Sequence, residues 1–165
     1  MTFEIGDKVV HPAHGAGTII AINEKRLHDH SNQYYVIFMP AKRFTILLAK
    51  EKADEAELRP ISQRTVLDKV WEILHTAPET LSNQHAERQD KIKEELGTGN
   101  ILKIAQALRD LAGREQGRHL TQGDRALLEQ AKSFVASEVA LARDLEMDEA
   151  QRLILAALQP INEES

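Results

Sequence analysis

The fold is decided by Gly6-Asp7-Lys8-Val9-Val10-His11-Pro12-Ala13-His14-Gly15-Ala16-Gly17-Thr18-Ile19-Ile20. Two runs of β-branched residues, Val9-Val10 and Thr18-Ile19-Ile20, lie on either side of a segment with one proline and two glycines. β-branched side chains favour strands, whereas proline and glycine favour turns. The pattern predicts a β-hairpin of the kind with which small barrels begin.

The strand-like pattern continues outward to Pro60. Short runs rich in branched and aromatic residues recur between turn formers or charged residues, at positions 8–10, 18–22, 34–38 and 44–48. Residues 28–32 are polar and predict a hairpin tip. Four or five short strands within 60 residues are typical of a small antiparallel barrel, which offers a sheet edge or groove to a partner. Tyr34 and Tyr35 are adjacent on one strand, so one ring is expected in the core and the other on the surface.

After Pro60 the apolar residues recur at intervals of three and four, the spacing of amphipathic helices. Suitable helix-starting residues recur, and Thr-Gln-Gly-Asp before the longest apolar stripe resembles a capping box. In chain order, the predicted starts are Ser62, Ser82 or Asn83, Asn100, Thr121 with Asp124, and Asp148. We therefore predict an α+β protein: a small antiparallel β-barrel over residues 1–60, followed by a bundle of about five α-helices over residues 61–165.

Composition excludes several classes of protein. The 165 residues contain no cysteine, which excludes disulfides, thiolate metal sites and cysteine nucleophiles and favours a cytoplasmic protein. No apolar run approaches the ~20 residues of a membrane span, and no charged-then-apolar leader precedes Phe3. We therefore expect no membrane association.

The net charge of −5 argues against a protein that coats nucleic acid by bulk attraction. The first 60 residues hold eight basic and eight acidic residues, so the remaining 13 basic and 18 acidic residues carry the whole excess of acid. Because phosphates must be met by Lys or Arg, any DNA contact in the helical part must be local.

Signatures of catalysis are absent from the sequence. There is no P-loop, dinucleotide fingerprint or serine nucleophile elbow. The acidic pairs Glu94-Glu95 and Asp148-Glu149 stand at a predicted helix end and helix start, where solvated carboxylates are common. We predict a protein that is not an enzyme and needs no cofactor.

Two histidine pairs come nearest to a metal site. His11 and His14 flank the first turn, and His28 and His30 lie on the predicted hairpin tip. Either pair would need a third ligand, and no recognised ligand spacing supplies one. We therefore interpret them as turn and surface residues and predict no metal. Trp71, the single tryptophan, could serve binding or packing; its place on an apolar stripe favours the core.

The residues resemble a known family, the CarD/CdnL family of bacterial transcription regulators. The run from Gly6 to Gly17 is similar to the start of the family's Tudor-like (SH3-like) barrel, which is shared with transcription-repair coupling factor. Helicase motifs are absent, which excludes the coupling factor itself. The helical half is similar in order and spacing at Leu67-Asp68-Lys69-Val70-Trp71, Leu96-Gly97-Thr98-Gly99-Asn100, Ile104-Ala105, Leu108-Arg109-Asp110-Leu111, Leu120-Thr121 and Leu127-Leu128.

This resemblance implies a non-enzymatic transcription regulator, expected to be monomeric, with two partners. The barrel of family members docks on the β subunit of RNA polymerase, and the implied contact residues here are Lys25, Thr45, Ile46 and Leu47. Leu47 replaces a position that is often basic in relatives, which predicts a more apolar interface. Independently, residues 44–48 form an apolar strand suited to pairing along its edge with a partner strand.

The resemblance also implies that the helical domain reaches promoter DNA and stabilises the open complex. Relatives place a tryptophan wedge where this chain has His85, and the basic residues that follow are reduced to Arg88 and Lys91. An imidazole buries less apolar surface than an indole, so unstacking a base step is less well compensated. Two alternatives remain: Arg88 and Lys91 belong to a solvated helix face, or the chain is a divergent paralogue that binds polymerase without stabilising melted DNA.

Overall fold

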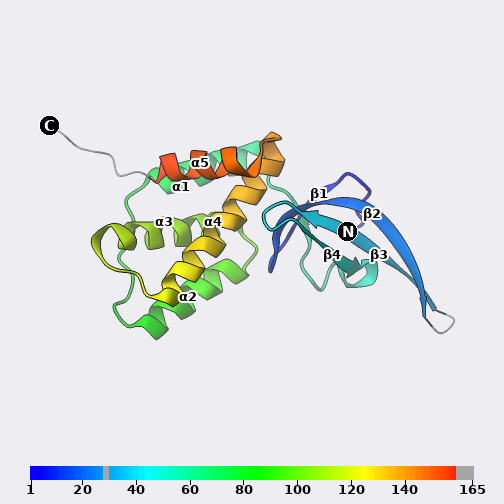
Figure 1. Ribbon diagram of the computed structural model, residues 1–165, viewed down its shortest axis with the longest axis horizontal. Helices are drawn as coiled ribbons and strands as arrows, with labels where there is room; N and C mark the ends of the chain where they lie inside the picture. Colours follow the sequence, from blue (N-terminus) through cyan, green and yellow to red (C-terminus); the bar gives the residue numbers. More distant parts are fainter. Residues whose placement is uncertain (28–29, 159–165) are drawn as a thin grey trace.

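The computed structural model describes residues 1–27 and 30–158 and has two parts (Figure 1). A β-sheet occupies one end of the molecule and five helices the other, and the long curved hairpin of the sheet points away from the helices. The predicted α+β class and order of the two parts are confirmed. His28 lies outside the described residues, so the predicted pairing of His28 with His30 is not described by the structure.

The sheet has five antiparallel strands in the order β4-β3-β2-β1-β5. Their bounds are β1 (Lys8–His11), β2 (Gly15–Leu27), β3 (His30–Met39), β4 (Phe44–Ala49) and β5 (Arg59–Pro60), with a short 3-10 helix η1 (Lys50–Lys52) after β4. The β1–β2 hairpin is the one predicted from the opening run. Between Ile19 and Ala21 the β2–β3 register shifts, and the extra residue, Ile20, is exposed.

The inner face of the sheet encloses a small core. Tyr35, Ile37 and Met39 alternate inward along β3, while Tyr34 is only half-buried, which confirms the opposite placement of the two tyrosines. The Tyr35 hydroxyl accepts a hydrogen bond from the Phe3 backbone N–H at 2.9 Å. Gly17 is required here because a Cβ atom at this position would lie 2.4 Å from Met39 Sδ.

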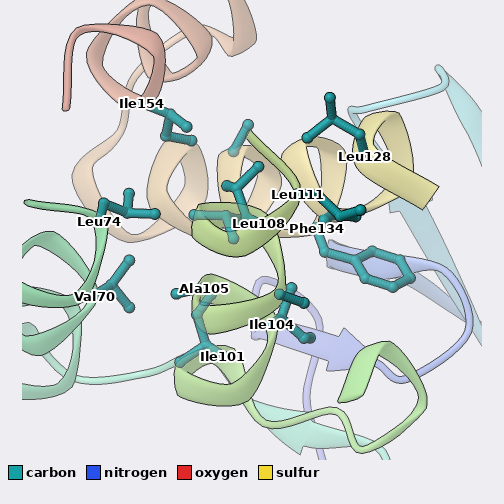
Figure 2. Packing of buried hydrophobic residues seen from close by; sticks show 14 of the residues in the cluster. Val70, Leu74, Ile101, Ile104, Ala105, Leu108, Leu111, Leu128, Phe134 and Ile154 are labelled. Carbon is teal, nitrogen blue, oxygen red and sulfur yellow. The ribbon is translucent and has the colours of Figure 1, made fainter. Parts of the chain in front are cut away.

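The helices form one bundle around a shared core. Their bounds are α1 (Arg64–His75), α2 (His85–Gly97), α3 (Ile101–Gly117), α4 (Gln122–Arg143) and α5 (Met147–Ala157). Figure 2 shows α3 at the centre, with Ala105 and Leu108 among side chains from its neighbours. Trp71 is half-buried against this core, as predicted, and the Arg143 guanidinium lies 5.4 Å from its ring centroid.

Helix starts follow the sequence prediction at two places and depart from it at three. Asn100 caps α3 by accepting from the Leu102 N–H, and Thr121 with Asp124 forms the predicted capping box of α4. The other N-caps are Gln63, Gln84 and Glu146, none of which makes a side-chain cap hydrogen bond.

The three differences have local causes. The Ser62 backbone N–H is held by Glu138 of α4, so α1 starts after it. The Ser82 hydroxyl accepts from the Gln84 N–H and forms a turn before α2. Asp148 lies inside the first turn of α5.

The sheet and the bundle meet along α4. Arg59 donates from both terminal nitrogens to the two Glu138 carboxylate oxygens, at 2.7 and 3.0 Å, and from Nε to the Gly99 carbonyl at 2.9 Å. The Ser137 hydroxyl accepts from the Ala16 N–H at 3.1 Å. Lys8 Nζ donates to the Leu141 carbonyl at 2.8 Å. The first hairpin and β5 are therefore attached to one stretch of α4, residues 137–141.

A second buried ion pair fixes α2 to the start of α4. Arg88 donates from Nε and Nη2 to the two Asp124 carboxylate oxygens at 3.0 and 2.8 Å, and both side chains are almost fully buried. Burial alone raises the pKa of the Asp124 carboxyl. The hydrogen bonds from Arg88, Thr121 and Gln89 outweigh that effect and lower the pKa to about 2.

We predict that Asp124→Asn destabilises the protein by about 3 kcal/mol at pH 7, because it leaves a buried guanidinium without its charge partner. Since the folded pKa lies below the unfolded value, the ionised carboxylate stabilises the fold above about pH 4, and this contribution is lost as the pH falls towards 2. Urea denaturation between pH 7 and pH 2 measures both effects, and the variant is expected to lose part of the wild-type pH dependence. Asp90→Asn, an exposed change on α2, is the control, and an equal loss in both variants would contradict the assignment.

Candidate functional site

The edge of the sheet presents an unpaired strand. Among the described strands β4 pairs only with β3, so its other side leaves backbone N–H and C=O groups free to pair. Its side chains alternate: Ile46 packs inward against the barrel core, whereas Thr45 and Leu47 point outward and are exposed. Of the residues predicted to bind a partner, Thr45 and Leu47 therefore share one surface and Ile46 supports it from beneath.

Apolar residues of β3 extend this surface. Phe38 lies directly opposite Thr45 and Val36 opposite Leu47, so all four share the outward side of the β3–β4 pair. Leu47 is 52% exposed and Phe38 37% exposed. We call Val36, Phe38, Thr45 and Leu47 the outer sheet face. Contiguous exposed apolar side chains on a small domain are typical of a protein interaction site.

Lys25 lies on β2, the next strand inward from β3. Its side chain is exposed, and its Nζ stands 5.8 Å from the centroid of the Tyr34 ring. Tyr34 in turn lies opposite Ala49 at the end of β4. Lys25 therefore adds a positive charge near one end of the outer sheet face, where it can orient an acidic partner.

Phe38 was missed by sequence reasoning, although the signal was available. Alternation along residues 34–38 puts positions 34, 36 and 38 on one face, opposite the core residues 35 and 37. The exposure of Ile20 could not be read in this way, because it depends on the bulge in β2.

The three residues predicted to contact DNA do not form one surface. His85 is the first residue of α2 and is exposed. Lys91 is half-exposed, with Nζ 3.8 Å from a Glu95 oxygen, a surface pair that contributes little. The structure corrects the prediction for Arg88: its guanidinium is buried in the ion pair with Asp124 and cannot meet a phosphate. The burial of Arg88 could not be predicted from the sequence, because its partner Asp124 lies 36 residues away in the chain.

The outward side of α2 is acidic as well. Glu87, Asp90 and Glu94 are exposed on this helix, and Lys91 and Lys93 are the exposed cations among them. Because DNA association requires neutralised phosphates, this side of α2 is a poor surface for the sugar–phosphate backbone. His85 is exposed where α2 begins, and the exposed cations of α2, Lys91 and Lys93, are outnumbered by its exposed carboxylates.

The histidines of the first turn are a local packing pair. The His11 and His14 rings have centroids 4.8 Å apart, and His11 Nδ1 accepts a hydrogen bond from the Ala13 N–H. Burial, followed by the neighbouring His14, lowers the pKa of His11. Within residues 1–27 and 30–158 no group of three or more His, Asp or Glu side chains is placed to hold a metal ion. The helices of the same residues include none long and apolar enough to cross a membrane.

Comparisons with known proteins divide the chain at the same place as the structure. Residues 3–62 match the family model "CarD-like/TRCF RID domain", and residues 69–155 match "CarD, C-terminal domain". The putative transcription factor YdeB of Bacillus subtilis (strain 168) is 31% identical over 147 residues, which cover 87% of this chain and 94% of that protein. With the sheet matched by one model, the bundle by the other and a relative aligned across both, this chain belongs to the CarD/CdnL-like family.

Proposed function

We propose that this protein is a non-enzymatic transcription regulator that binds the β subunit of RNA polymerase through its sheet and promoter DNA through its helical bundle. The observation that carries the proposal is the outer sheet face, which spans β3 and the unpaired edge strand β4 within the region similar to the CarD-like/TRCF RID domain. Such a regulator acts in the bacterial cytoplasm, where polymerase is found, and we expect it to act as a monomer.

The chemistry of the outer sheet face suits a strand from a partner. The free edge of β4 supplies backbone hydrogen bonds, which give affinity with little dependence on partner sequence. Leu47 and Phe38 supply apolar contact, and full burial of one such side chain contributes about 1.5–3 kcal/mol. The positive charge of Lys25 can orient an acidic partner strand on this face. Together, the edge of β4, the side chains of Leu47 and Phe38, and the charge of Lys25 can pair with a partner strand, bind it and set its direction.

We predict that Leu47→Glu weakens binding to the polymerase β subunit at least tenfold, because it replaces apolar contact with a charge that must be desolvated. Binding of the full-length protein to immobilised β subunit measures this. Ile5→Glu also replaces an exposed apolar residue with a charge, at a position that is 63% exposed and belongs to neither β3 nor β4, and it is expected to bind as wild type. The interface assignment fails if Leu47→Glu binds as tightly as Ile5→Glu.

The DNA half of the proposal centres on His85. Its imidazole is exposed at the start of α2, free to stack on a base or reach a phosphate. The alternative, a divergent paralogue that occupies polymerase without stabilising melted DNA, is favoured by two observations: the acidic side of α2 and the burial of Arg88. The lifetime of the open promoter complex distinguishes a protein that stabilises melted DNA from one that only binds polymerase.

We expect wild-type protein to lengthen the lifetime of polymerase open complexes, His85→Ala to lose most of that effect, and His85→Trp to exceed wild type, because an indole compensates better for an unstacked base step. A competitor-challenge assay measures the lifetimes, with Lys93→Ala, an exposed change later on α2, as the control. If wild type has no effect and only His85→Trp lengthens the lifetime, the paralogue function is the correct one.

A further inference from the structure

One edge of the bundle carries more positive charge than its carboxylates neutralise. It lies where α3 ends, beside the loop that precedes α2. Arg114 and Arg118 line one cleft there, and Arg118 and Arg88 donate to the neighbouring residues Asn83 and Ser82 of that loop. Asp124 is the buried carboxylate of the group, and both of its oxygens are already occupied by Arg88. Arg114 and Arg118 are left as two further cations at this edge.

Arg114 has an unused donor. Its Nε–H is buried and finds no acceptor within the part of the chain that the structure describes. A buried guanidinium nitrogen without an acceptor is costly, so this arginine is less well satisfied than Arg88, which is fully paired. Burial, then the charges of Arg88 and Arg118, lower the pKa of Arg114, which is the direction expected where cations crowd together.

Arg118 is the arginine of this group that contacts the loop just before His85. It is exposed just after the end of α3, and its Nη1 donates to the side-chain oxygen of Asn83, two residues before His85. A cleft of about 210 Å³ adjoins it, lined by residues 78–81 and by the last turn of α3. A Cβ atom at Gly117 would meet nothing within 4 Å, so a ligand can approach the helix end closely.

Helix capping and local ion pairing do not account for all of these arginines. Cations near a helix C-terminus interact favourably with its carbonyls, which suits one arginine in the last turn but not the accumulation of two beside Arg88. Glu79 also lines the cleft, and its exposed carboxylate offsets one of the two arginine charges there, so Arg114 and Arg118 together leave a net positive charge. The acidic side of α2 is unfavourable for phosphates, so a DNA backbone near His85 is better placed towards the α3 end.

We propose that Arg118, with Arg114 behind it, binds a backbone phosphate of promoter DNA next to the base step that His85 contacts. The planar guanidinium fork matches phosphate oxygens and forms charge-assisted hydrogen bonds with them. The inference rests on the proposed DNA contact of the helical bundle and specifies which cations make it. It also moves the phosphate contact from Arg88 and Lys91 of α2 to the end of α3.

The test is a titration of full-length protein with a fluorescently labelled promoter duplex, forked at its upstream edge, at several KCl concentrations between about 50 and 200 mM. Arg118→Gln is expected to weaken binding about tenfold and to reduce the slope of log affinity against log salt by about 0.9, which corresponds to one phosphate contact. Arg114→Gln is expected to change both quantities in the same direction.

Two control variants separate charge from structure. Asn83→Ala removes the hydrogen bond to Arg118 but keeps the guanidinium, so its salt slope is expected to equal that of wild type. Arg64→Gln removes one exposed cation at the start of α1, beside the opposite end of α3, and is also expected to keep the wild-type slope. A purely structural role of Arg118 would instead make Asn83→Ala as weak as Arg118→Gln.

The outcomes that overturn the proposal differ from those that overturn the function. If wild type binds the duplex and Arg118→Gln keeps its affinity and slope, only the phosphate assignment fails. If wild type does not bind the duplex at all, the DNA half of the proposed function fails with it. Inorganic phosphate is titrated in parallel by following the arginine Nε–H resonances, and binding of that ion without binding of the duplex also overturns the proposal.

Discussion

The structure depends on one buried carboxylate, that of Glu138 in the second half of α4. It accepts hydrogen bonds from two Arg59 nitrogens and from the Ser62 backbone N–H, and it is 1% exposed. A carboxylate so far from water is tolerated only when it is paired, because its desolvation penalty exceeds what a single weak contact returns. Both partners belong to the segment that joins sheet and bundle, so this segment cannot swing freely without exposing a buried charge.

Helix α4 thereby connects the two surfaces that we propose to bind partners. Asp124 in its first turn fixes α2 through Arg88, and Glu138, 14 residues later and about 21 Å along the axis, fixes the sheet through Arg59. Figure 1 shows α4 running from the region of α2 to the sheet. The sheet is attached to this helix by the partly buried Arg59–Glu138 pair, and α2 is attached to it by the fully buried Arg88–Asp124 pair. We infer that this arrangement holds the surface proposed to bind polymerase and the surface proposed to bind DNA at a fixed separation.

Sequence reasoning succeeded where local chemistry decides the structure. The first hairpin, the tyrosine alternation and the capping box at Thr121 all depend on residues close together in the chain. It failed where the deciding partner is distant: Arg88 reads as a surface cation on a polar helix until Asp124 is placed against it. Glu138 gave no sequence signal for the same reason. Helix starts at Gln63 and Gln84 also escaped prediction, because contacts in the preceding turns, rather than side-chain caps, set them.

The central claim, that the ion pair between Arg59 of β5 and the buried Glu138 carboxylate of α4 holds the sheet in a fixed position on the bundle, is tested most directly by a distance measurement between the two parts. The chain has no cysteine, so spin labels at Asn23→Cys on β2 and Lys93→Cys on α2 report a single pair in pulsed electron paramagnetic resonance. We predict one narrow distance distribution, which broadens when Glu138→Gln is added and stays narrow with Glu129→Gln, an exposed change on the same helix. A broad distribution in the otherwise unaltered protein, or no broadening with Glu138→Gln, would contradict the claim.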